Sequence, residues 1–135
     1  MSNSRFPICM HILTLLAKSD ELLSSEYIAG SINANPALVR KEISNLRQLG
    51  LIETREGKNG GSMLAKPAKQ IKLSEVYNMV RSSSLLGQSK NSPNPACLVG
   101  RQINTHLTEL YDEVEQALIK KLEKQTLESF ANKFQ

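Results

Sequence analysis

Apolar side chains recur every three or four residues along most of the chain, which is the period of a helix with one buried face. The pattern predicts six helices, within residues 4–18, 24–32, 33–52, 71–82, 95–124 and 126–134. The first is apolar on nearly every side, so we expect it at the centre of the fold. The sequence therefore predicts a mainly α protein.

The helix within residues 33–52 carries the clearest boundary signals. Asn35 suits the cap of a helix, Pro36 suits its first position, and Gly50 suits the residue just after its end. Apolar residues at i, i+4 and i+7 form its inner face: Val39, Ile43 and Leu46. The opposite face carries Ala37, Arg40, Lys41, Ser44 and Arg47.

A β-hairpin is predicted directly after this helix. Residues 51–55 and 62–65 read as short strands, and the sequence GKNGG between them offers glycine and asparagine for the positive φ angles of a tight turn. The tip of the hairpin carries Arg55, Lys58, Asn59 and Gly60. Small and basic residues at such a tip can approach a phosphate backbone closely.

The excess positive charge lies in one segment of the chain. The formal net charge is +4, and 40% of the residues are hydrophobic. Residues 35–72 hold eight Lys or Arg and three Glu, whereas residues 1–34 and 73–135 are close to neutral. A local basic patch on a neutral body indicates a polyanionic partner.

The order of helix, helix, capped basic helix and hairpin is typical of a winged helix-turn-helix. In that fold the third helix offers its outer face to the major groove of double-stranded DNA, and the hairpin reaches the adjacent backbone. The alternative is that the basic residues form an ordinary solvated helix face. We favour DNA because the charge excess, the helix start and the glycine-rich tip occur together.

A serine-, asparagine- and proline-rich stretch precedes the longest predicted helix. We expect a DNA-binding domain over residues 1–82, a flexible loop over 83–96, and a dimerisation helix with a short terminal helix over 97–135. About 30 helical residues span roughly 45 Å, more than the small domain before them, so the apolar stripe of this helix needs a partner. We assign dimerisation to Ile103, Leu107, Leu110, Val114 and Leu118.

Several classes of function lack the residues they need. Cys9 and Cys97 are 88 residues apart, which matches no metal-binding or redox pair motif, and His11 and His106 have no ligand-spaced neighbours. The apolar run near the start is too short to span a bilayer and lacks a cleavage site. The sequence shows no nucleotide-binding fingerprint or catalytic triad pattern. We therefore expect a cytoplasmic protein that is not an enzyme and holds no cofactor.

The chain resembles the Rrf-two (Rrf2) family of bacterial winged-helix transcription regulators. The most specific matches are L-G-L-I at the end of the basic helix, the G-x-x-G-G hairpin tip and the I-x-L-x-E-V helix that follows. The resemblance implies a homodimer joined by the long helix that binds a palindromic operator, often as a repressor. It implies DNA contacts at Asn35, Pro36, Ala37, Arg40, Lys41 and residues 55–61. Glu56 departs from the pattern, because the family often has arginine there.

The resemblance also implies a sensor region, where this sequence departs most. Cluster-binding members have C-x5-C-x5-C before the long helix, sometimes with a histidine. Cys97 takes the third cysteine position, but Leu85 and Asn91 take the other two and Gly100 stands where a histidine could be. Iron–sulfur clusters need several thiolates, so the sequence predicts the cluster-free branch.

Cys97 has two interpretations. With Asn94 as the cap of the long helix, Cys97 is the third helical residue, beside unpaired backbone donors that favour the reactive thiolate. It would then act as a redox or electrophile sensor; alternatively it is an inert remnant. For the whole chain, the alternatives are a regulator without an effector and a protein-interaction module whose long helix binds another protein.

Overall fold

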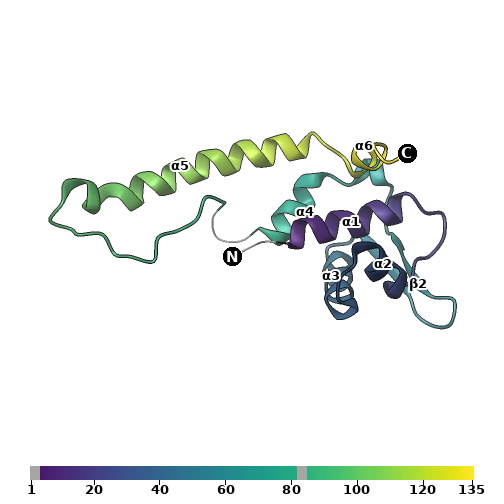
Figure 1. Cartoon of the computed structure of the whole chain (residues 1–135). Helices are drawn as coiled ribbons and strands as arrows, with labels where there is room; N and C mark the ends of the chain where they lie inside the picture. Colours follow the sequence, from purple (N-terminus) through teal and green to yellow (C-terminus); the bar gives the residue numbers. More distant parts are fainter. Residues whose placement is uncertain (1–3, 82–84) are drawn as a thin grey trace.

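In the computed structural model, residues 4–81 and 85–135 are described, and they form a winged helix with a long protruding helix (Figure 1). The elements are α1 (Arg5–Ala17), α2 (Ser25–Ile32), α3 (Pro36–Gln48), β1 (Ile52–Arg55), β2 (Gly61–Leu64), the 3-10 helix η1 (Ala68–Gln70), α4 (Leu73–Val80), α5 (Leu98–Glu123) and α6 (Leu127–Ala131). This confirms the predicted mainly α fold with a small hairpin.

Helix α1 lies at the centre of the body, as its apolar sequence predicts. It contacts α2, α3, α4, α6 and β2. Its fully buried residues include Ile12 and Leu13, and each such side chain contributes about 1.5–3 kcal/mol relative to exposure. The α3 side chains Val39, Ile43 and Leu46 complete the core beneath it.

Both ends of α3 form as the sequence predicts. The Asn35 Oδ1 accepts a hydrogen bond from the Ala37 backbone at 2.8 Å, and Pro36 occupies the first turn. At the other end Gly50 has a φ of 87°, its N–H donates to the Arg47 carbonyl, and the Leu51 N–H donates to the Leu46 carbonyl. This pair of bonds is a Schellman motif, which stops the helix and directs the chain into β1.

The hairpin is an antiparallel pair in which Ile52 faces Leu64 and Arg55 faces Gly61. Gly60 is required at its tip, because a Cβ atom there would lie 2.1 Å from the Arg55 carbonyl oxygen. The backbone of Leu23, just before α2, pairs with Ser62 of β2. This bridge fixes the hairpin against the start of α2.

The long helix begins later than predicted, so Asn94 is not its cap. Helix α5 starts at Leu98 with Cys97 as the N-cap residue, and Cys97 is therefore not the third helical position. The Asn94 side chain accepts from the Ala96 backbone at 2.9 Å and forms a separate turn instead. The same bond at Asn35 opens a helix because Val39 is buried in the core, whereas the chain around Cys97 is exposed.

Helix α6 and residues 82–84 bear on the domain boundaries that the sequence predicts. Helix α6 packs on α1 and contributes Leu127 to the core, so by its contacts it belongs with the body, although the sequence analysis grouped it with the long helix. Residues 82–84, which held the predicted helix end and loop start, lie outside the described residues.

Helix α5 leaves apolar side chains uncovered. Its second half lies beside α4, where Arg81 forms an ion pair with Glu115, and its first half extends beyond the body (Figure 1). None of its 26 residues is buried. The exposed apolar side chains are Leu98, Val99, Ile103 and Leu110, and Leu107, Val114 and Leu118 are half-buried. Within residues 4–81 and 85–135, no helix has the length and apolar character of a membrane span.

Candidate DNA-binding surface

The start of α2, the outer face of α3 and the hairpin enclose a groove of about 450 Å³. Residues three or four apart share one face of a helix, so one face of α3 supplies its predicted contacts together. The predicted site residues that line the groove are Arg40, Ser44, Arg47, Arg55, Lys58 and Gly60. The fold therefore brings the basic helix and the hairpin to one surface.

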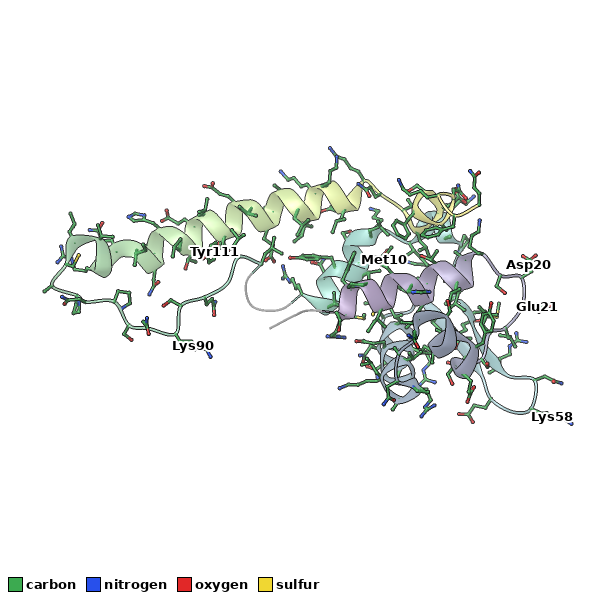
Figure 2. The ribbon with its side chains drawn as sticks, in the orientation of Figure 1. Met10, Asp20, Glu21, Lys58, Lys90 and Tyr111 are labelled. Carbon is green, nitrogen blue, oxygen red and sulfur yellow. The ribbon has the colours of Figure 1, made fainter. Side chains whose placement is uncertain are left out.

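The groove is positively charged. Four cationic side chains line it against the carboxylates of Glu26 and Glu56. Within the described parts of the chain, Arg40, Arg55 and Lys58 have no ion-pair partner and are exposed. Lys58 lies at the outer bend of the hairpin and points into solvent (Figure 2). These cations can neutralise phosphates without first losing an internal partner.

Several groove residues escaped the sequence analysis. Ser25, Glu26 and Thr54 line the groove, and Thr54 Oγ1 accepts a hydrogen bond of 3.5 Å from Arg47. Ser24 also lines the groove, and it is the N-cap residue of α2. No local pattern distinguishes the groove-facing Glu26 from any exposed acid in a first helical turn.

The remaining predicted contacts lie outside the groove. Asn35, Pro36 and Ala37 are exposed at the start of α3, where the Asn35 Oδ1 is engaged by its own helix. Lys41 lines a separate hollow on the other flank of α3, beside Arg5. Asn59 lines a hollow on another side of the hairpin.

A half-buried ion pair supports α3 on the side away from the groove, and no pattern in the sequence predicts it. The Arg5 guanidinium of α1 donates from Nε to Glu42 Oε2 at 2.7 Å and from Nη2 to Glu42 Oε1 at 3.0 Å. Asn45 Nδ2 donates to Glu42 Oε1 at 3.0 Å. The partners are 37 residues apart, so only the tertiary structure joins them.

This pair also governs the ionisation of the Glu42 carboxyl. Burial by itself raises the pKa of Glu42, but the hydrogen bonds from Arg5 and Asn45 and the positive charge of Arg5 outweigh it, and the pKa lies below its ordinary value. The neighbouring Cys9 is fully buried, and burial followed by the negative charge of Glu42 raises its thiol pKa to about 12. Cys9 is therefore a core thiol with little thiolate.

Cys97 is exposed at the start of α5 and makes no side-chain capping hydrogen bond. Leu85 and Asn91 occupy the positions that hold the other two cysteines in the cluster-binding pattern. Both are exposed, and neither carries a thiol. Among the described residues, no group of three or more His, Cys, Asp or Glu could hold a metal ion.

The comparisons with known proteins agree with this geometry. The sequence profile of the Rrf2 family, described as "Iron-dependent Transcriptional regulator", matches residues 2–133. The chain belongs to the Rrf2 family. This confirms the resemblance seen in the sequence.

Rrf2 relatives match over nearly the full chain. YwnA of Bacillus subtilis (strain 168), named as an HTH-type transcriptional regulator, is 39% identical over 132 residues, covering 98% of each chain. NsrR of Oceanobacillus iheyensis, also named as an HTH-type transcriptional regulator, is 27% identical over 126 residues, covering 89% of this chain and 86% of its own. These relatives are regulators of transcription rather than enzymes.

A solved structure supports the fold. CymR, titled the global cysteine regulator of B. subtilis, superposes with a TM-score of 0.73 at 20% identity, covering 100% of this chain and 98% of its own.

The family description mentions iron, but the residues of this Rrf2 chain do not fit an iron–sulfur cluster. Such clusters are held mainly by cysteine thiolates, usually four. Cys97 is exposed, whereas Cys9 is buried in α1, where burial raises its pKa to about 12. One accessible thiol per chain cannot hold a cluster.

Proposed function

We propose that this Rrf2 protein is a homodimeric repressor that reads a palindromic operator with α3. The hairpin contacts the adjacent phosphate backbone of the DNA. The observation that carries the proposal is the groove, in which four cations from α3 and the hairpin meet on one exposed surface. Two copies related by a two-fold axis would present two such grooves to successive major grooves. A dimer bound across a promoter would exclude polymerase.

Selection from a randomised duplex library tests the proposal directly. We expect the wild-type protein to enrich an inverted repeat and to prefer it over unselected duplex in competition. An absence of enrichment, together with capture of the protein by a partner through α5, would favour the alternative of a protein-interaction module.

Lys58→Ala is expected to weaken binding to all DNA sequences alike. Lys58 lies at the outer bend of the hairpin (Figure 2), where we expect it to contact a phosphate rather than a base edge. Each lost phosphate contact lowers the slope of log affinity against log salt concentration by about 1. Titrations of selected and unselected duplex at several salt concentrations measure both effects. A change in base preference would show that Lys58 reads sequence.

The exposed face of α5 supports the homodimer. Ile103 is 38% exposed and Leu110 is 48% exposed in the protomer, and both lie on the helix that extends from the body. Together with the half-buried Leu107, Val114 and Leu118 they form a continuous apolar stripe. Exposed apolar stripes of this kind mark association surfaces.

A second apolar surface fits the same assembly. A hollow of about 670 Å³ lies between α1, the end of α5 and α6, lined mainly by apolar side chains that include Phe6, Met10, Leu122 and Phe130. If two α5 helices pair antiparallel about a point near Leu110, the start of one helix lies beside the end of the other. The exposed Val99 of the second copy would then lie near this hollow.

We also propose that Cys97 is a redox sensor. Its exposure at the start of α5 supports access by a small oxidant. Hydrogen peroxide would transfer one oxygen atom to the Cys97 thiolate, giving a sulfenic acid and hydroxide. In the antiparallel dimer this modification would lie at the interface, so it can change the spacing of the two α3 helices.

Mild peroxide is expected to lower the operator affinity of the wild type but not of Cys97→Ser. Cys9 is buried and poorly ionised, so it should not react under these conditions. Mass spectrometry locates the modification, and operator titration before and after treatment measures its effect. Unchanged affinity with Cys97 modified would show that the thiol is an inert remnant.

A further inference from the structure

The DNA-facing helix α3 is held by a polar contact on the side away from the groove. The carboxylate of Glu42 accepts two hydrogen bonds from the Arg5 fork and one from Asn45, at 2.7 to 3.0 Å. The Glu42 side chain is 2% exposed, whereas that of Arg5 is 41% exposed. The contact therefore has one buried end on α3 and one end that reaches solvent from α1.

Stability alone does not require this arrangement. The neighbouring core positions of α3 are the apolar Val39, Ile43 and Leu46. Removing the Glu42 carboxylate from water is costly, and replacing a buried ion pair by apolar residues is often neutral or stabilising. What a bidentate arginine–carboxylate pair adds is geometry, because two parallel hydrogen bonds fix both the distance and the relative orientation of the two groups.

The position of Glu42 affects where the α3 side chains that line the groove lie. Glu42 lies two residues from both Arg40 and Ser44, which line the groove on the other side of α3. Side-chain atoms lie about 5–6 Å from a helix axis, so a rotation of about 10° moves them by about 1 Å. Hydrogen bonds to base edges do not tolerate such a displacement.

We propose that Glu42, held by Arg5, is a positioning residue that fixes the rotation of α3 and so determines how selectively the surface reads bases. The inference rests on the proposed function, because it assigns a cause to sequence preference. If the Arg5–Glu42 pair only stabilised the fold, base selectivity would fall together with folding stability. A positioning role instead predicts that base selectivity falls while folding stability is kept.

The test uses the double variant Arg5→Leu/Glu42→Leu in the full-length protein. This change removes one charge of each sign, so the net charge is constant, and it leaves every groove residue in place. The probes are the duplex that the wild type enriches from a randomised library and an unselected duplex of the same length. We expect a melting temperature at or above that of the wild type, unchanged affinity for unselected duplex, and a selectivity ratio lower by roughly tenfold or more, the scale of one lost base contact.

Two further variants complete the test. Arg5→Lys keeps the charge but replaces the fork by a single point contact, so we expect a folded protein with an intermediate selectivity ratio. Lys66→Met removes an ion pair to Glu75 at a distance from α3 and should leave the ratio unchanged.

Two outcomes would overturn the inference and leave the proposed function intact. A folded double variant with the wild-type ratio overturns it, and if the double variant fails to fold, Arg5→Lys with the wild-type ratio overturns it. A wild-type protein that enriches no sequence instead overturns the proposed function, and this inference with it.

Discussion

Leu110→Asp is expected to convert the protein to monomers and to reduce operator affinity sharply. The Leu110 side chain is 48% exposed in the protomer, so an aspartate there leaves the protomer fold intact. In the dimer it would bury a charge without a partner, at a cost of about 3 kcal/mol or more in each subunit. Sedimentation measures the mass, and DNA titration measures the loss of bivalent binding, which is about 10²–10⁴ in affinity.

Gln116→Asp is the matched control for this prediction. It adds the same charge to the same helix, about 120° around the axis from Leu110, and its position is exposed. We expect it to remain dimeric and to bind the operator like the wild type. A wild-type protein that sediments as a monomer at micromolar concentration would contradict the dimer itself.

Arg40→Ala is expected to relax base preference at one position of each half-site. Arg40 lines the groove from α3, is exposed and has no ion-pair partner in the described residues, so its guanidinium can donate to a base edge. Loss of such a contact costs about 1–3 kcal/mol against the preferred base. Affinity measured across single-base variants of the selected operator shows the position that Arg40 reads.

Lys41→Ala provides the comparison. The two residues are adjacent and carry the same charge, but Lys41 lines the hollow on the other flank of α3. We expect Lys41→Ala to weaken all duplexes modestly and to leave the order of preference unchanged. If Arg40→Ala instead lowers the affinity for every sequence by one factor, Arg40 contacts only phosphate.

Local sequence signals predicted the elements of the DNA-binding surface well. The cap at Asn35, the helix end at Gly50 and the hairpin tip at Gly60 all form as predicted, because each depends on residues within a few positions of one another. The prediction that Asn94 caps the long helix was wrong, because its hydrogen bond from the Ala96 backbone closes a turn rather than beginning a helix. A cap needs a helix that packs, and the residues after Asn94 have no core to pack against.

The sequence by itself determined the family, the order of the elements, the concentration of charge in residues 35–72 and the lack of cluster-binding cysteines. These features are local or compositional, so no distant contact is needed to see them. Only the tertiary structure decided which flank of α3 each basic residue occupies, that α6 returns to α1, and that Arg5 holds Glu42. The last of these is a contact between residues 37 positions apart, in which the Arg5 side chain reaches solvent and the Glu42 side chain is buried. A helical period predicts that a residue is near the core, but the packing partner of a buried charge depends on how separate helices meet in space.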